Sequence, residues 1–316
     1  MKRFLVNILH FSLVAIVGYM LLLFLFGDLG WVRTANSTLG NTGHLNSRIK
    51  DIPNYHDIDV LFLGSSHCYR TFDTRFYSQH GYKCFNLGSS NQTPMQTLVL
   101  LKDYLDSLRP RRAVMEVHQD ILDNDGVECS VDLLTNAPIT CNSTAMVFKV
   151  NNMRVYNTWL YNLYSQRVRH RLEQFVEDTV IDQAVYQPGG YVKITGRTFE
   201  RKRYPRRDIH IRPEQMDALK ECIAMLRERD IPVLLVEVQD AKQLRSTFKN
   251  HPWFEQQMTD LAPYYYPILP MIDTVHFANS NHLYQPGIDL FNQHFVQVLD
   301  CWFATDTLPS PPREEQ

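Results

Sequence analysis

Three short polar segments of this 316-residue chain contain the residue types that nucleophilic catalysis requires. The sequence SSH at 65–67 follows the apolar run IDVLFLG, NLGSSN spans 86–91, and NSNHL spans 279–283. A serine hydroxyl needs a base such as histidine to take its proton, and acyl transfer needs N–H donors where the oxyanion develops. Each segment alone is more typical of a turn or a helix N-cap. Their order along the chain indicates a serine nucleophile, an oxyanion turn and a late basic histidine.

Alternating strands and helices must hold these segments together. In open α/β sheets, sites gather at the carboxyl ends of the strands, and the first two segments each follow an apolar run directly. The alternation predicts βαβ units, and hence an α/β fold with a central parallel sheet covered by helices on both faces. Strands are expected at 58–64, 83–88, 112–118 and 231–239, with a fifth available from 264–273, and helices at 93–110, 211–230 and 287–303.

The remaining segments are expected to surround this α/β unit. Residues 120–210 separate the third strand from the next helix and are too many for a plain loop, and residues 151–187 have helical periodicity. We therefore expect a helical insertion that caps the sheet. Residues 27–56 have no clear period and indicate a linker, and the Pro-rich residues 304–316 indicate a disordered tail.

The N-terminal segment has the composition of a membrane span. Residues 4–26 contain no charged residue, and a helix of that length extends about 34 Å, enough for the hydrocarbon core of a bilayer. Lys2 and Arg3 precede it, so the positive-inside rule places the N-terminus in the cytoplasm and the rest of the chain outside. We expect a transmembrane anchor over 1–26. A cleaved signal peptide is the alternative, although the apolar run is long for one and no small-residue cleavage site follows it.

The overall composition excludes several classes of protein. Lys and Arg number 32 and Asp and Glu 34, so the net charge of −2 gives no basic field for a nucleic-acid partner. A mean hydropathy of −0.28 excludes a polytopic membrane protein. None of the six cysteines forms a C-x-x-C pair, so the spacing predicts no zinc site. Cys129 and Cys141 flank one short loop and are the best candidates for a disulfide.

The three polar segments, read with their flanking residues, resemble a known superfamily. FLGSSHCYR, FNLGSSNQTPMQT and NSNHLYQPGIDLFN are similar to the blocks of SGNH/GDSL hydrolases. The resemblance is to the membrane-anchored bacterial branch, which includes the alginate O-acetyltransferase-like proteins and the D-alanyl transfer protein of teichoic acid synthesis. It covers 57–303 apart from the insertion. It implies a three-layer, flavodoxin-like fold with a Ser–His–Asp triad.

The resemblance also implies roles for individual residues. Ser66 takes the position of the nucleophile, and its backbone N–H takes that of one oxyanion donor. Gly88 or Asn91, in the second block, would supply another donor. His282 takes the position of the catalytic base.

One departure from the family pattern concerns the partner of this histidine. Asn279 stands where the family has the triad aspartate. An amide can orient an imidazole through its carbonyl, but it cannot stabilise the imidazolium as a carboxylate does. Asp273 could substitute, and with His276 it forms a competing Asp-x-x-His. His282 is favoured because the residues after it match the family block.

A second departure lies after the third strand, where the family has a Gly-x-Asn block. Glu116, His118 and Gln119 take that strand end instead, and Gln119 could donate the hydrogen bond of the missing asparagine. The alternative is that these are ordinary polar residues at a sheet edge. In the second block, Asn91 also replaces a later glycine of the family. The missing Gly-x-Asn block and the missing glycine both argue against full hydrolytic activity.

A basic segment, RTFERKRYPRRDIHIR at 197–212, stands out against the near-neutral chain. It could attract an acidic polysaccharide or anionic lipid headgroups, and a solvated loop is the alternative. Residues that could bind substrate are those next to the nucleophile and those of this loop, namely His67, Arg70, Arg201, Arg203 and Arg206.

These observations lead to two functional hypotheses. The first is an extracytoplasmic enzyme, held in the inner membrane by a single span, that transfers or removes an O-acyl group, most simply acetyl, on a cell-envelope polysaccharide. This chemistry needs no metal or organic cofactor, and the resemblance implies a polytopic acyltransferase partner for a transferase. The second is a non-catalytic protein of the same fold that binds glycan or scaffolds an envelope assembly.

Overall fold

The central feature of the computed structural model, which describes residues 1–29 and 38–313, is a five-stranded parallel sheet. Its order, β2-β1-β3-β7-β8, becomes 2-1-3-4-5 when these strands are counted along the chain, which is the flavodoxin-like order. The predicted α/β fold with a central parallel sheet is therefore confirmed. The strands are β1 (Val60–Leu63), β2 (Cys84–Asn86), β3 (Arg112–Glu116), β7 (Val233–Val236) and β8 (Tyr264–Tyr265).

Helices cover both faces of this sheet, because alternate side chains of each buried strand point to opposite sides. Leu61 and Leu63 of β1 belong to one hydrophobic core, with residues of α5 (Pro94–Leu108) and α11 (Pro213–Arg227). Val60 and Phe62 belong to the other core, which includes Phe72 and the buried face of α15 (Gln285–Thr305). Short helices α3 (Ser66–Thr71) and α4 (Thr74–Gln79) follow β1. The result is the expected three-layer arrangement.

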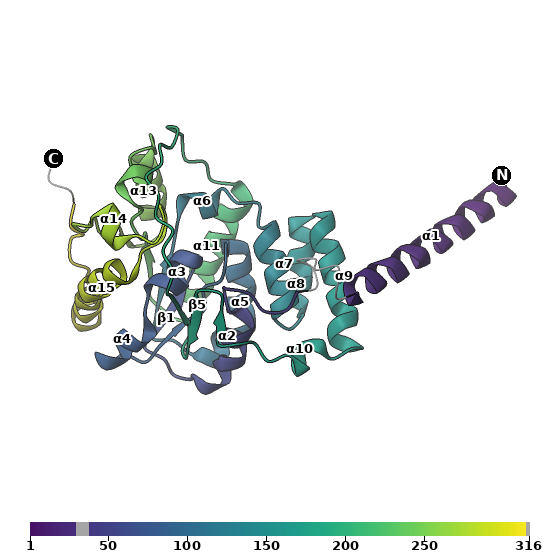
Figure 1. Cartoon of the computed structure of the whole chain (residues 1–316), viewed down its shortest axis with the longest axis horizontal. Coiled ribbons are helices and arrows are strands. Elements are labelled where there is room, and N and C mark those ends of the chain that lie inside the picture. The colour runs from purple at the N-terminus through teal and green to yellow at the C-terminus, as the bar shows by residue number, and fades with distance from the viewer. Residues whose placement is uncertain (30–37, 314–316) are drawn as a thin grey trace.

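The insertion between β3 and α11 is helical only in its first part. Helices α7, α8 and α9 pack on one another, α7 and α8 also pack on α5, and the three lie between the α/β core and the N-terminal helix (Figure 1). The expected helix over 151–187 stops at 174, because β-branched and aromatic residues around the turn Pro188-Gly189-Gly190 form a small antiparallel sheet. The elements are α6 (Gln119–Leu122), α7 (Val127–Asn136), α8 (Cys141–Val150), α9 (Met153–Arg167), α10 (Arg171–Gln174), β4 (Val180–Ile181), β5 (Ala184–Gln187) and β6 (Tyr191–Ile194).

The prediction of a linker over 27–56 is wrong for its C-terminal half. Helix α2 (Leu45–Asp51) and a 3₁₀ turn over Ile52–Asn54 pack into the first hydrophobic core through Leu45, Ile49 and Ile52. Arg48 of α2 is fully buried and donates hydrogen bonds to the carbonyls of Gly43 and Gly190. Residues 30–37 of the expected linker lie outside the described part of the chain.

The prediction of a disordered tail over 304–316 is also wrong where the structure describes it. Helix α15 continues to Thr305. The carbonyl of Pro312 then accepts a hydrogen bond of 2.9 Å from the N–H of Ile268, and Arg313 forms an ion pair of 2.7 Å with Glu255. Residues 314–316 lie outside the described part.

The expected disulfide between Cys129 and Cys141 is absent, and both thiols are free. The segment between them is not a loop, because α7 continues to Asn136 and holds Cys129 inside the core. The Cys129 thiol donates to Gln96 Oε1 at 3.0 Å, whereas Cys141 is exposed at the start of α8. Burial raises the pKa of the Cys129 thiol to about 12, which disfavours the reactive thiolate.

Helix α1 (Lys2–Asp28) projects from the rest of the molecule (Figure 1). It has 27 residues, a most apolar stretch with a mean hydropathy of 2.4, and no buried residue. Its length and composition are sufficient to cross a membrane.

Candidate active site

The nucleophile candidate Ser66 lies at the turn between β1 and α3. Gly64 makes this turn with φ +142°, a conformation that side chains disfavour, and an added Cβ would lie 2.5 Å from the Glu116 carboxylate. Ser65 caps α3 by accepting a hydrogen bond from the His67 N–H. Ser66 is therefore the first residue of α3 and is 8% exposed.

The structure brings Ser66 and His282 together although 216 residues separate them. The Ser66 Oγ lies 2.8 Å from His282 Nε2. On the other side of the ring, His282 Nδ1 lies 3.1 Å from Asn279 Oδ1. The three side chains thus form a hydrogen-bonded chain of serine, imidazole and amide, with Asn279 in the place that an aspartate would take in a Ser–His–Asp triad.

The backbone around Asn279 decides which ring nitrogen of His282 carries the proton. The N–H groups of Asn281 and His282 lie 3.1 Å and 2.9 Å from Asn279 Oδ1, so that atom must be the carbonyl oxygen of the amide. An oxygen that accepts these bonds can only accept from His282 Nδ1, which therefore bears the hydrogen. His282 Nε2 is then unprotonated and accepts from the Ser66 hydroxyl, which is the tautomer that general-base catalysis requires.

The surroundings of His282 favour its neutral form. Burial lowers the pKa of His282 well below its usual value, and the nearby cationic groups of Arg70 and His118 lower it further. Within the described residues, the hydrogen-bond partner of His282 Nδ1 is the Asn279 amide and not a carboxylate. His282 is therefore ready to accept a proton at neutral pH, but the imidazolium that results is stabilised less than in a triad with aspartate.

Two further histidines stack behind His282. The ring of His67 lies between the other two, with its centroid 4.8 Å from that of His282 and 4.1 Å from that of His118. The ring planes differ by 17° and 13°. His67 and His118 are buried, and His67 Nδ1 lies 3.2 Å from Ser65 Oγ. Burial and the neighbouring histidines lower the pKa of His67 well below its usual value, so the middle ring is neutral.

A buried carboxylate anchors the far end of this stack. Asp240, which follows β7, lies 3.3 Å from His118 Nε2 through both of its oxygens. Burial opposes the charge on His118, but Asp240 outweighs it and raises the pKa of His118 to about 9. Asp240 thus favours a proton on His118 Nε2, which faces that carboxylate, while His118 Nδ1 accepts a hydrogen bond of 3.2 Å from the N–H of Asp120.

His67, His118 and Asp240 have the residue types of a metal site, and their candidate ligand atoms all lie within 4.8 Å of one another. Their geometry does not suit a metal ion. The lone pair of an imidazole nitrogen lies in the ring plane, and the two rings are stacked with their planes only 13° apart, so the lone pairs do not converge on one point. These residues form a buried ion pair with a stacked ring instead.

Most of the expected oxyanion donors are engaged elsewhere. The Gly88 N–H donates to Asn86 Oδ1 at 3.1 Å, and the Gln119 amide donates to Asp240 Oδ2 at 3.1 Å. The Asn91 amide donates to Glu128 on the surface at 3.1 Å. The Ser66 N–H, at the start of α3, donates no hydrogen bond within the described residues and remains a donor candidate.

Arg70 is the predicted substrate-binding arginine whose charge acts on this site. It follows Ser66 by one turn of α3, and its charge affects the pKa of both His282 and His67. Its Nε is buried without a hydrogen-bond partner among the described residues. His67, by contrast, is buried in the histidine stack, where it orients rings rather than meets solvent.

The basic loop lies over the segment that carries the base. The Tyr204 hydroxyl donates to Ser280 Oγ at 2.8 Å, and the N–H of Thr198 donates to the carbonyl of Ala278 at 2.9 Å. Arg197 also donates to the carbonyl of Phe277. The loop thus packs against residues 277–282 from outside. It covers part of the site that a helical cap was expected to cover.

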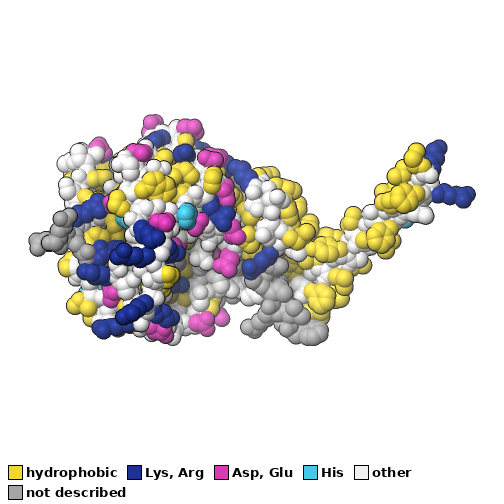
Figure 2. Space-filling model, turned by 90° about the horizontal axis from the view of Figure 1, so that it is seen from above, with side chains coloured by type: hydrophobic (Ala, Val, Ile, Leu, Met, Phe, Trp, Pro, Cys, Tyr) yellow, Lys and Arg dark blue, Asp and Glu magenta, His cyan; other side chains and the backbone are white. Residues whose placement is uncertain are grey.

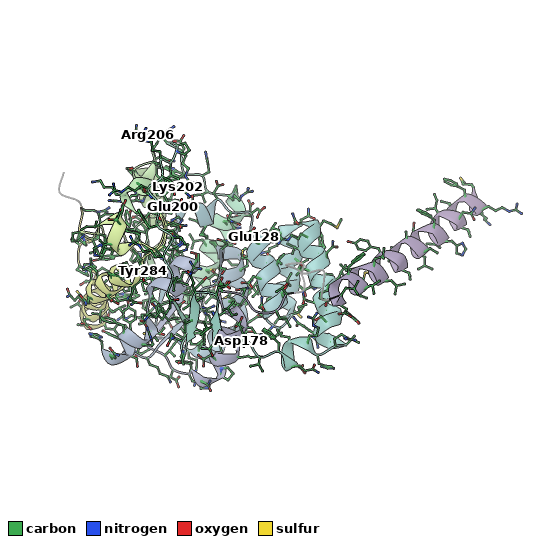
Figure 3. All side chains as sticks on the ribbon, in the orientation of Figure 1. Glu128, Asp178, Glu200, Lys202, Arg206 and Tyr284 are labelled. Carbon is green, nitrogen blue, oxygen red and sulfur yellow. The ribbon has the colours of Figure 1, made fainter. Side chains whose placement is uncertain are left out.

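The charged side chains of this loop are exposed to solvent. Arg201, Arg203 and Arg206 are exposed, and the labelled Lys202 and Arg206 lie at the end of the molecule opposite α1 (Figure 3). These arginines are not brought together with Ser66 in a common site.

The two alternative partners for the histidine are placed elsewhere. The Asp273 carboxylate accepts hydrogen bonds from the N–H groups of Lys242 and Gln243, so it does not orient His282. His276 Nδ1 lies against the backbone of Ile272, the residue that precedes its helix α14 (Asp273–His276).

Sequence reasoning missed two contributors, Asp240 and Tyr204. Asp240 follows the predicted strand 231–239, so the rule that sites gather at carboxyl strand ends could have indicated it. Tyr204 contacts Ser280 only because the chain folds back across the site, and no local pattern predicts that contact.

Comparisons with known proteins add little to this geometry. No protein-family model matches the chain, and no curated protein matches it significantly. Among solved structures, one described as a "putative acylhydrolase" from Bacteroides fragilis NCTC 9343 shares 12% identity at a TM-score of 0.39, over 81% of this chain and 96% of the other. A "GDSL-like lipase" from Bacteroides thetaiotaomicron VPI-5482 shares 11% identity at a TM-score of 0.39, over 82% of this chain and 98% of the other.

Proposed function

We propose that this chain is a membrane-anchored, extracytoplasmic serine esterase or O-acyltransferase of the SGNH type, acting on O-acyl groups, most simply acetyl, of a cell-envelope polysaccharide. The observation that carries the proposal is the hydrogen-bonded chain from Ser66 Oγ through His282 to Asn279. The sequence resemblance and the flavodoxin-like strand order support it. Helix α1 supports the anchoring, through its length and composition.

The arrangement supports a two-step acyl transfer. Ser66 Oγ attacks the acyl carbonyl while His282 Nε2 takes the hydroxyl proton, and a tetrahedral oxyanion forms. This intermediate collapses, the sugar oxygen leaves with the proton from His282, and the acyl group stays on Ser66. Water or an acceptor hydroxyl then attacks the acyl-enzyme, gives its proton to His282, and Ser66 recovers the proton when the acyl group departs. Water gives an esterase and a sugar hydroxyl gives a transferase.

The oxyanion requires donors beside Ser66. The Ser66 N–H is one candidate, and the Arg70 guanidinium, whose charge lowers the pKa of His282, is a candidate side-chain donor. A transferase would also receive its acyl group across the membrane, so a polytopic acyltransferase is the partner that this version of the proposal requires.

The test is turnover of an acetyl ester by the full-length chain in lipid nanodiscs. We expect Ser66→Ala to reduce kcat/KM by about 10³-fold or more, and Ser78→Ala, an exposed serine on α4, to leave it unchanged. Wild-type protein should also react covalently with a fluorophosphonate probe, at Ser66. Equal turnover in wild type and Ser66→Ala would remove Ser66 from the mechanism.

A second function is favoured because the expected oxyanion donors already form hydrogen bonds to other groups. Because Gly88, Asn91 and Gln119 bind other groups and Asn279 replaces a carboxylate, the same fold could bind glycan or scaffold an assembly without catalysis. That function predicts no fluorophosphonate labelling, normal cellular function in Ser66→Ala, and loss of function when charges in 197–212 are reversed.

A further inference from the structure

The helical insertion ends in an exposed apolar tip. Helix α8 ends at Val150 and α9 begins at Met153, and the side chains on either side of this turn include Phe148 (58% exposed) and Met153 (69% exposed). The rings of Tyr156 and Trp159 lie 5.8 Å and 5.7 Å from that of Phe148. Large apolar side chains exposed at one place indicate a surface that meets something other than water.

Contacts between α1 and α9 show how this tip is oriented. The Tyr19 hydroxyl of α1 donates to Asn157 near the start of α9, whereas Asp28 at the end of α1 accepts from the Tyr161 hydroxyl at 3.0 Å. The rings of Phe24 and Tyr164 stack at 4.4 Å. Tyr19, the earliest of these α1 residues, thus pairs with Asn157, the earliest of these α9 residues. The start of α9, and the tip before it, therefore face the N-terminal side of α1.

Close packing holds the two helices in this relation. An added Cβ at Gly27 would lie 2.1 Å from the ring of Tyr161, so only glycine permits this approach. The hydroxyl of Tyr164 also donates to Asp28, at 3.2 Å. The position of the tip relative to α1 is thus fixed by the fold.

The depth of the tip follows from these pairs. Tyr19 precedes the end of the apolar segment at residue 26 by seven positions, or about 10 Å along a helix. Asn157 contacts Tyr19, so the first turn of α9 lies beside the outer end of the apolar segment. Apolar side chains cover α1 in the space-filling view and continue onto the adjoining surface of the domain (Figure 2).

The chemistry of the tip suits a membrane interface. Lys149 and Arg154 are exposed beside Phe148 and Met153, and Trp159 is partly exposed. Apolar residues that enter the acyl boundary, with cations and aromatic rings at the headgroup level, are the pattern of interfacial membrane contacts.

We propose that the α8–α9 tip, formed by residues 148–154, inserts into the outer headgroup–acyl boundary of the bilayer that α1 spans. This inference rests on the proposed anchoring by α1. A domain held at two points cannot rotate freely about the end of its anchor. The tip therefore fixes the height and orientation of the Ser66 site above the membrane surface.

The test measures depth with a fluorophore on single cysteines in full-length protein in nanodiscs. The background carries Cys141→Ser and Cys301→Ser, because the four other cysteines are buried. Labels are placed by Met153→Cys at the tip, by Val14→Cys in the middle of α1, and by Ile272→Cys. Ile272 is 59% exposed and precedes α14 at the opposite end of the molecule (Figure 1).

We expect lipids with a nitroxide on the upper acyl chain to remove most of the emission of the label at 153 and to leave that at 272 unchanged. The label at 14 should be quenched by nitroxides deeper in the chain. If the label at 14 is deep while that at 153 is unquenched, the tip proposal fails and the anchor stands. If the label at 14 is not quenched, both the anchor and the tip proposal fail.

Discussion

The imidazole ring of His67 stacks on that of His282, with centroids 4.8 Å apart and planes 17° apart. His118 stacks on the opposite face of His67, so the buried middle ring cannot move away. His282 is thus held on one face by rings and on one edge by Asn279. This makes His67 a positioning residue for the base.

Two substitutions of His67 should show whether its flat ring or its imidazole nitrogens are needed for activity. We expect His67→Ala to lower kcat by about 10-fold to 100-fold with little change in KM, because a base that is free to rotate spends less time in reach of Ser66. His67→Phe keeps a flat ring and should retain most of the activity. Steady-state turnover of an acetyl ester gives kcat and KM for both variants. A phenylalanine variant as slow as the alanine variant would show that the imidazole nitrogens, not the stack, are needed.

Restoring a carboxylate beside His282 should increase activity. Asn279→Asp keeps the acceptor for the N–H groups of Asn281 and His282, and it adds a negative charge next to His282 Nδ1. The charge raises the pKa of His282, which burial now depresses, and it stabilises the imidazolium. We expect kcat/KM to rise by about 10-fold or more, and its acidic limb to move to higher pH.

The matched control is Asn279→Leu, which removes the acceptor and adds no charge. It should reduce kcat/KM below the wild-type value, since His282 then loses the partner that fixes its tautomer. An Asn279→Asp variant that is slower than wild type, with an unshifted acidic limb, would contradict the role assigned to position 279.

The pair of His118 and Asp240 should make stability depend on pH above neutrality. The folded-state pKa of His118, about 9, exceeds the unfolded value of about 6.5. The stabilisation from this group is therefore complete below about pH 6.5 and is lost as the pH rises to about 9. The double variant His118→Gln, Asp240→Asn should remove this part of the pH dependence, which melting temperatures at pH 6 and pH 9.5 would show. An unchanged difference between the two pH values would mean that other groups cause it.

The sheet and the meeting of Ser66 with His282 were predictable for a physical reason. Strands buried on both faces are mostly apolar, so β1 and β7 appear in the sequence as short apolar runs, and β3 has an apolar centre between Arg112 and Glu116. Their carboxyl ends lie on one edge of a parallel sheet, which is where polar residues that follow a strand collect. The strand pattern therefore located the turn that holds Ser66, and the family resemblance selected His282 as its partner.

The donors and the buried charges were not predictable in the same way. Whether the Gly88 N–H is free depends on the rotamer of Asn86, which occupies it, and that is decided by packing. Asp240 follows a strand, a position where many residues are exposed. It is buried and paired here because it contacts His118, which stacks on His67. Short strands such as β4 and β5 contain too few residues to show a period.

The segment that was expected to be a linker provides the last prediction. Arg48 of α2 is fully buried, and its guanidinium donates to the carbonyls of Gly190 and Gly43 and lies 5.0 Å from the ring centre of Tyr69. A polar segment can thus pack into the core when backbone carbonyl oxygens accept the hydrogen bonds of its buried guanidinium. Arg48→Met keeps the volume but leaves these carbonyls without donors, at a cost of about 1–3 kcal/mol for each buried group. We expect a lower melting temperature than for wild type, with Lys220→Met, an exposed position on α11, as the matched control. If Arg48→Met and the control melt alike, residues 43–51 contribute nothing to the folded domain and the packing of α2 is incidental.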